Sequence, residues 1–201
     1  MRKLTERKIV LASHNKGKLS EISELLNPFG ISVVSAADLD LKEPEETENT
    51  YAGNARIKAH FAAKSSNLPA LSDDSGFSVH TLDGAPGVYS ANWAETAHGR
   101  DFPMAMTKVW NKIQHSPIPR KAKFCCTLCI AWPDGHDEIF EGSVAGEIVW
   151  PPRGTLGFGY DPMFIADGMA QTFAEIEPQE KHLISHRASA FNKFTRYCLG
   201  S

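Results

Sequence analysis

The apolar positions in the first 34 residues follow two different periods, which predict a strand, a helix and a second strand in that order. Residues 9–12 form a short continuous apolar run, typical of a buried strand. Leucine and isoleucine then recur at helical spacing up to Leu26, and Asn27, Pro28 and Gly30 end that pattern. Residues 31–34 are apolar again. This opening predicts an α/β protein with ligand-binding loops at the ends of its strands.

Residues 50–64 predict a second helix, which Thr50 caps and whose inner face consists of alanines. Residues 70–72 and 77–79 have the composition of two short strands. Between them lies the polar sequence Asp73-Asp74-Ser75-Gly76, so we expect its carboxylates at a turn or a bulge. The remaining pattern predicts helices over residues 101–114 and 186–199, hairpin strands over 124–132 and 138–142, a strand over 147–150 and a loop over 151–160.

Composition narrows the class of protein. The chain has 201 residues, which is the size of a single domain. We expect one domain over residues 1–201, made of two intimately packed lobes without a linker. The formal net charge is −3. The chain lacks the basic excess that binding of duplex nucleic acid requires. No run of eighteen apolar residues and no signal-peptide pattern occurs, so we expect a cytoplasmic protein without membrane contact. Cys125, Cys126 and Cys129 include a C-x-x-C spacing, but their apolar, β-prone surroundings favour a buried strand over a zinc or redox site.

The first candidate site is the polar loop after the first strand, Ser13-His14-Asn15-Lys16-Gly17-Lys18. It places a hydroxyl group, an amide, a glycine and two lysines at a helix N-terminus, where free backbone N–H groups and the helix dipole favour an anion. It does not match the P-loop pattern, which needs two glycines and a terminal hydroxyl. The residues alone leave two interpretations open, a phosphate site and a solvated polar turn.

The second candidate is the acidic pair Asp73-Asp74. Adjacent carboxylates repel each other unless they are exposed, hydrogen-bonded or bridged by a cation, and oxygen ligands favour Mg²⁺. Glu45 or Glu46 is a candidate for a further carboxylate, although that stretch also reads as a solvated acidic loop. Asp74-Ser75-Gly76 also matches the aspartic-protease turn, but the chain has one copy of it and at least four predicted helices, which argues against a protease.

The third candidate joins aromatic residues to glycines in Gly157-Phe158-Gly159-Tyr160-Asp161-Pro162. Such a loop stacks on a base while its backbone reads the base edge, or it is a structural turn with aromatic plugs. Lys181 and the sequence Ser185-His186-Arg187 follow. Because Ser185 is a candidate N-cap, the histidine and the arginine would project from the start of a helix.

These motifs and the segment Gly84-Ala85-Pro86-Gly87-Val88-Tyr89-Ser90-Ala91, in this order and spacing, resemble the inosine/xanthosine triphosphate pyrophosphatase family from about Lys8 to Cys198. The resemblance implies an elongated, two-lobed α/β fold around a long mixed sheet, with the active site in the cleft between the lobes. It implies a homodimer that hydrolyses dITP, ITP and XTP to the monophosphate and pyrophosphate. A non-hydrolytic nucleotide-binding regulatory protein and a pyrophosphatase for other modified nucleotides remain alternatives.

The resemblance also implies a role for each motif residue. Asp74 would be the general base and, with Glu46, a ligand of Mg²⁺. The triphosphate would bind Ser13, His14, Asn15, Lys16, Gly17 and Lys18, and Ser75 would contact the substrate. The base-side pocket would consist of Phe158, Gly159, Tyr160, Asp161, Lys181, His186 and Arg187. His14 stands where many members of the family carry a small residue, and the sequence does not assign its role.

Overall fold

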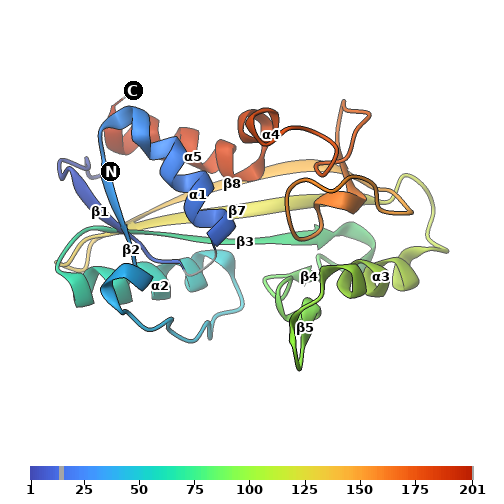
Figure 1. Ribbon diagram of the computed structural model, residues 1–201, viewed down its shortest axis with the longest axis horizontal. Helices are drawn as coiled ribbons and strands as arrows, with labels where there is room; N and C mark the ends of the chain where they lie inside the picture. The colour runs from blue at the N-terminus through green and yellow to red at the C-terminus, as the bar shows by residue number, and fades with distance from the viewer. Residues whose placement is uncertain (14–15, 201) are drawn as a thin grey trace. The chain divides into compact units, whose positions relative to one another are not determined.

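The computed structural model of the protein describes residues 1–13 and 16–200, except for the side chains of Lys16 and Glu21, and its main feature is a mixed β-sheet (Figure 1). The strand order within these residues is β2-β1-β3-β7-β8-β9, and β4 pairs with β3. Strand β1 is parallel to β2 and to β3. Strand β4 is antiparallel to β3, and β9 is antiparallel to β8. The strands are β1 (Lys8–Leu11), β2 (Ser32–Ser35), β3 (Ala70–Val79), β4 (Pro86–Gly87), β7 (Lys121–Ala131), β8 (Asp137–Ile148) and β9 (Phe164–Ala166), and a separate pair is β5 (Glu95–Thr96) and β6 (Gly99–Arg100).

The predicted helices are present with small shifts at their ends. The α-helices are α1 (Lys16–Leu26), α2 (Tyr51–Ser66), α3 (Phe102–Ile113), α4 (Pro178–Ile184) and α5 (His186–Phe194), which the π-helical turn η6 (Thr195–Leu199) follows. The Thr50 hydroxyl accepts the Gly53 backbone N–H, and Asp101 caps α3 in the same way. Helix α4 was not predicted. Short 3₁₀ turns are η1 (Asn27–Phe29), η2 (Ala37–Leu39), η3 (His80–Leu82), η4 (Asn92–Ala94) and η5 (Asp161–Met163).

Two strand predictions were wrong in the same way. Asp73 and Asp74 lie inside one strand of ten residues, β3, and not at a turn between two short strands. Residues 138–142 and 147–148 likewise belong to the single strand β8. In both places polar or small residues interrupt the apolar run. The strand continues in β3 because Asp73 and Asp74 have lysine partners, and in β8 Gly146 pairs with Ala166 of β9.

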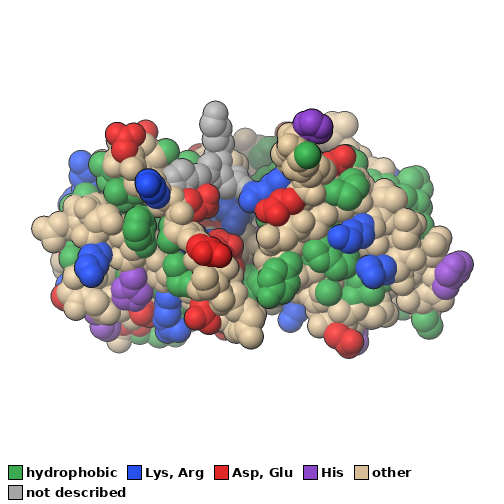
Figure 2. Space-filling view, turned by 90° about the horizontal axis from the view of Figure 1, so that it is seen from below, with side chains coloured by type: hydrophobic (Ala, Val, Ile, Leu, Met, Phe, Trp, Pro, Cys, Tyr) green, Lys and Arg blue, Asp and Glu red, His purple; other side chains and the backbone are tan. Residues whose placement is uncertain are grey.

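The chain divides into two compact units. Unit 1 consists of Met1–Asp74, Cys126–Gly142 and Ser189–Ser201, and unit 2 of Ser75–Cys125 and Ser143–Ala188. Strand β3 therefore passes from unit 1 to unit 2 between Asp74 and Ser75. Within the described residues, no helix is long and apolar enough to span a membrane. On the face drawn in Figure 2, acidic and basic side chains are interspersed.

The core of unit 1 has two layers, one on each face of its part of the sheet. In Figure 1, α1 and α5 cover one face and α2 covers the other. Ile9 and Leu11 of β1 pack in the α1/α5 layer, whereas Val10 packs with the alanines of α2. In β7, Cys126 packs in the α1/α5 layer and Cys129 packs in the α2 layer. Successive residues of a strand therefore face opposite helices, as the two-residue period of a strand requires.

Unit 2 has one apolar core that is rich in aromatic rings. Phe77, Phe124, Phe164 and Phe173 contact one another there, with ring centroids 4.9 to 6.0 Å apart along the contacting pairs. Helix α3 adds its apolar side, which includes Val109. These rings fix the backbone that carries the aromatic loop around residues 157–161.

Candidate active site

The loop after β1 leads into the first turn of α1, as the sequence predicts. Ser13 is buried and lies two residues after the end of β1, and Gly17 and Lys18 lie in the first turn of the helix. His14 and Asn15 lie outside the described residues, and so does the side chain of Lys16. The backbone N–H groups of this first turn are the anion-binding feature of a helix N-terminus. The described residues thus end in a helix N-terminus, and the phosphate site at this position stays a prediction.

Asp73 and Asp74 point to opposite faces of β3, and each meets a lysine from a different helix. Asp73 forms an ion pair with Lys18 of α1 and accepts a hydrogen bond from the Cys126 thiol, with 3.0 Å between Sγ and Oδ2. Asp74 Oδ1 lies 3.0 Å from the ammonium group of Lys58 on α2. The two carboxylates are therefore compensated separately, and their adjacency in the sequence does not by itself require a bridging metal ion.

Lys58 connects Asp74 to the acidic segment before α2. Its Nζ atom lies 2.6 Å from Glu46 Oε1 and 3.0 Å from Asp74 Oδ1. Glu46 thus supplies the carboxylate that contacts Lys58, which favours it over Glu45 as the functional residue. The sequence reasoning missed Lys58. The sequence feature that could have identified it is the helical spacing, which places this lysine between Ala55 and Ala62 on the face of α2 that packs against the sheet.

Burial and neighbouring charges act against each other in this cluster. Burial raises the pKa of Asp74, although the positive charges of Lys58 and Lys18 oppose the increase. Burial also acts to lower the pKa of Lys58, but the charges of Asp74 and Glu46 outweigh it and hold that pKa above its ordinary value. Asp74 is therefore a stronger base than a solvent-exposed aspartate and stays next to a cation, which suits a residue that accepts a proton.

The two carboxylates around Lys58 fit a divalent cation. Asp74 Oδ2 is buried and has no hydrogen-bond partner within residues 1–13 and 16–200. Glu46 offers a second, partly exposed carboxylate on the other side of the same ammonium group. No cluster of three or more acidic, histidine or cysteine side chains occurs among the described residues. Mg²⁺ needs no such cluster, because it binds one or two carboxylates and completes its shell with water and substrate phosphates.

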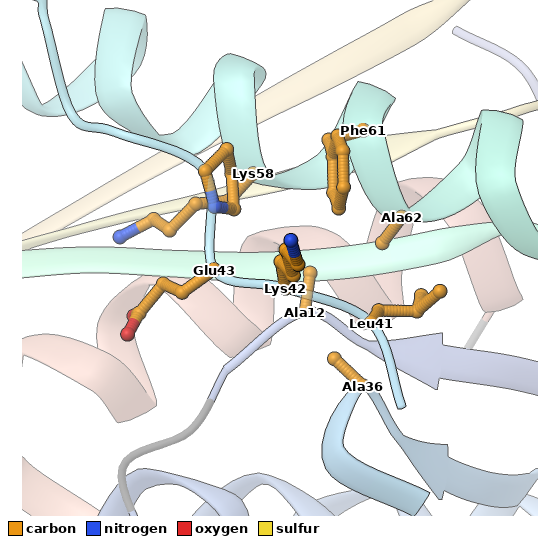
Figure 3. A pocket seen from close by; sticks show the side chains of 9 residues that line it. Ala12, Ala36, Leu41, Lys42, Glu43, Lys58, Phe61 and Ala62 are labelled. Carbon is orange, nitrogen blue, oxygen red and sulfur yellow. The ribbon is translucent and has the colours of Figure 1, made fainter. Parts of the chain in front are cut away.

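A small pocket of unit 1 lies beside Lys58, and its lining is mainly apolar (Figure 3). Figure 3 shows Leu41, Phe61 and Ala62 at one end, while the ammonium group of Lys58 points away from them. The aliphatic part of the Lys58 side chain thus lies along the apolar lining of the pocket, and its ammonium group reaches the carboxylates of Glu46 and Asp74.

The loop at residues 157–161 is organised around a buried ion pair in unit 2. Lys181 Nζ lies 2.6 Å from Asp161 Oδ2, and both side chains are almost fully buried. The same carboxylate accepts the backbone N–H of Phe158 at 2.8 Å. Gly157 has a φ of +71°, and a β-carbon there would overlap the Asp161 carboxylate. The ion pair and the glycine together fix the conformation of the loop.

The two aromatic rings of this loop differ in exposure. Phe158 is 38% exposed, and the Lys181 ammonium lies 4.7 Å from its ring centroid. Tyr160 is 2% exposed, stacks on Phe77 and donates its hydroxyl to the Ser90 carbonyl at 3.0 Å. Phe158 is thus available for stacking on a base, whereas the ring of Tyr160 packs in the core of unit 2. Gly159 lies between them with a φ of +69°.

The third group of candidate residues begins helix α5. The Ser185 hydroxyl accepts the Ala188 backbone N–H at 3.1 Å, which confirms the predicted N-cap. His186 stacks on Phe124, and the guanidinium group of Arg187 lies 3.4 Å from the Ser75 hydroxyl. Arg187 is 1% exposed. Arg187 is therefore a buried cation at the start of α5, and a guanidinium group has the planar set of donors that suits a carbonyl or an anion.

Comparisons with known proteins agree over almost the whole chain. The model of the Ham1 family matches residues 9–197. A dITP/XTP pyrophosphatase of Ruegeria pomeroyi is 59% identical over 194 residues, which cover 96% of this chain and 95% of that protein. One of Agrobacterium fabrum is 57% identical over 212 residues, covering 99% of each chain. The solved structure of a HAM1 protein from Coxiella burnetii superposes with a TM-score of 0.89 at 37% identity, covering 98% of this chain and 100% of that one.

Proposed function

The chain belongs to the Ham1 family, and from this premise we propose that it hydrolyses dITP, XTP and ITP to the nucleoside monophosphate and pyrophosphate. The mixed α/β fold and the family agree with those that the sequence predicts. The observation that carries the catalytic assignment is the Asp74–Lys58–Glu46 cluster, with its buried carboxylate oxygen. The function is the removal of deaminated purine nucleotides from the nucleotide pool.

Asp74 is the general base of the proposed reaction. It accepts a proton from a water molecule while the water oxygen forms a bond to the α-phosphorus. The bond between the α-phosphorus and the oxygen that bridges to the β-phosphate breaks, and pyrophosphate leaves with that oxygen. Lys58 keeps Asp74 ionised before the reaction, since its ammonium group lies 3.0 Å from Oδ1. The raised pKa of Asp74 increases its proton affinity relative to an exposed aspartate.

Glu46 and Asp74 are the residues that would hold Mg²⁺. When bound there, the ion would supply positive charge that offsets the charge of the triphosphate and favours attack by a nucleophile. The phosphate chain itself binds the first turn of α1, through backbone N–H groups and through Lys18. We include Ser13, His14, Asn15, Lys16 and Gly17 in this phosphate site because they directly precede Lys18 in the sequence.

The base-side residues are those of unit 2. Phe158 stacks on the purine, with Lys181 and Asp161 as the ion pair behind the loop. Arg187, which the Ser75 hydroxyl contacts, donates to a carbonyl at position 6 of the purine. Adenine has an amino group at that position, so its N–H donors would face the donors of the Arg187 guanidinium group. Two opposed donors leave buried polar groups unpaired, which strongly disfavours adenine nucleotides. Gly159, Tyr160 and His186 support this pocket.

The decisive experiment compares pyrophosphate and orthophosphate release from dITP, XTP, dGTP and dATP, with and without Mg²⁺. We expect pyrophosphate from dITP and XTP in the presence of Mg²⁺. Asp74→Asn should lower turnover by roughly 100- to 10,000-fold, since it removes the base. Asp83→Asn changes an exposed aspartate of unit 2 and serves as the matched control. Release of orthophosphate alone, or a preference for dATP, would contradict the proposal.

Two further expectations concern the state of the protein. We propose a homodimer, for which sedimentation equilibrium should give about twice the chain mass of 22.1 kDa. We also propose a cytoplasmic location, since all four cysteines are free thiols, as is usual in a reducing compartment.

A further inference from the structure

Asp73 is a buried carboxylate whose two oxygens have different partners. Oδ1 pairs with the Lys18 ammonium, and Oδ2 accepts a hydrogen bond from the Cys126 thiol at 3.0 Å. The side chain of Asp73 has no solvent exposure, and that of Lys18 is only 15% exposed. The thiol therefore acts on the carboxylate that holds a lysine of the phosphate-binding helix.

The position of Cys126 follows from the sheet. Strand β7 is the neighbour of β3, and Cys126 belongs to the apolar cluster on the α1/α5 face that also contains Leu71 and Leu128. These apolar neighbours cannot donate a hydrogen bond to a carboxylate. Hydrogen bonds to an ionised acceptor are stronger than neutral ones, and a buried carboxylate requires donors.

We propose that Cys126 is a positioning residue for the phosphate site: its thiol fixes the plane of the Asp73 carboxylate, and the carboxylate holds Lys18 in place. The terminal torsion of an aspartate is broad, so a donor on one oxygen determines where the other oxygen points. An ammonium group has three donors, so Lys18 can keep one on Asp73 and direct another toward a phosphate. This inference rests on the proposed role of the α1 loop in binding the triphosphate.

The test compares variants with and without a donor at residue 126. Cys126→Ala should raise the KM for dITP and the dissociation constant of pyrophosphate by roughly 5- to 20-fold, with a smaller change in kcat. Cys126→Ser should recover most of the affinity, because its hydroxyl group also donates. Cys126→Val, which fills the space without a donor, should behave like Cys126→Ala. Cys129→Ala removes a buried thiol from the other face of the same strand and should leave both constants unchanged.

A double-mutant cycle shows whether the effect passes through Lys18. Cys126→Ala should add little to the loss of pyrophosphate affinity that Lys18→Met causes, since both changes disturb one linked set of contacts. Additive losses would overturn the proposal. So would equal affinities of Cys126→Ala and Cys126→Ser, or a Cys126→Ala variant that lowers only the melting temperature.

Calorimetric binding of pyrophosphate separates this inference from the proposed function. It requires no turnover, so it reports on the phosphate site even in an enzyme that releases nothing from dITP. Failure of the wild-type protein to hydrolyse dITP would contradict the proposed function. Failure of residue 126 to influence pyrophosphate binding would contradict the positioning role.

Discussion

At the scale of single residues, the candidate catalytic cluster depends on one buried lysine that connects two carboxylates. Lys58 is 5% exposed, and its ammonium group contacts Glu46 and Asp74. Removal of one partner from a buried ion pair is strongly unfavourable, because it leaves uncompensated charge. The activity of the cluster should therefore be more sensitive to Lys58 than to any exposed lysine of the same helix.

We predict that Lys58→Met lowers dITP turnover by roughly 100-fold or more, since Asp74 then loses the charge that keeps it ionised. The measurement is kcat for pyrophosphate release at saturating Mg²⁺. Lys64→Met, an exposed substitution in the last turn of α2, is the matched control and should retain full activity. A Lys58→Met variant with wild-type kcat would remove Lys58 from the mechanism.

At the scale of elements, the first turn of α2 anchors the segment that carries Glu46. The Asn54 side chain accepts the backbone N–H of Glu48 at 3.0 Å, and Asn54 is buried. Gly53 lets the Glu48 side chain lie directly against the helix, because a β-carbon at Gly53 would be 2.5 Å from Glu48 Cβ. Lys58 then contacts Glu46 one turn further along the helix. The helix thus fixes both the backbone and the carboxylate of this segment.

Gly53→Ala should accordingly raise the Mg²⁺ concentration for half-maximal activity several-fold, because it displaces the Glu46 segment. Alanine favours a helix over glycine by about 1 kcal/mol, but its β-carbon would also lie 3.0 Å from the Thr50 hydroxyl that caps α2, so the melting temperature is measured beside the cation affinity. Paramagnetic resonance of bound Mn²⁺ gives the cation affinity independently of turnover. Ser65→Ala, at an exposed position near the end of α2, is the control. An unchanged cation affinity in Gly53→Ala would show that the close contact at Glu48 does not position Glu46.

At the scale of the whole molecule, an ion-pair bridge between α2 and β8 stabilises the fold at neutral pH, and this contribution is lost in acid. Arg56 Nε and His60 Nε2 lie 3.1 and 2.9 Å from the Asp137 carboxylate. Burial acts to raise the pKa of Asp137, but the hydrogen bonds from His60 and Arg56 outweigh it and lower that pKa. A lowered pKa in the folded state stabilises the fold above the unfolded pKa, and this contribution disappears as the pH falls through the folded pKa.

The urea midpoint of the wild-type protein should therefore fall more steeply below about pH 4 than that of Asp137→Asn. Above that pH the variant should be the less stable of the two, and at strongly acidic pH the difference between them should decrease. Asp40→Asn, an exposed substitution at a residue with a φ of 52°, is the control and should follow the wild-type curve. A constant difference between wild type and Asp137→Asn at all pH values would contradict the linkage.

The sequence by itself determined the elements with an uninterrupted period, the polar stretch between β1 and the body of α1, the caps Thr50 and Ser185, and the family. These properties depend on neighbouring residues or on the order of motifs along the chain, so they can be predicted without knowledge of long-range contacts. It did not reveal β3 as one strand. Asp73, Asp74 and Ser75 break the apolar run, and a polar break is the usual sign of a turn.

Only the tertiary structure decided how that polar break is accommodated. Strand geometry sends Asp73 and Asp74 to opposite faces, where Lys18 and Lys58 arrive from two different helices. The contact of Cys126 with Asp73 and the burial of Tyr160 also depend on packing between distant segments. Compensation of a buried charge requires partners that are close in space, and the linear spacing of residues carries no direct record of such long-range contacts.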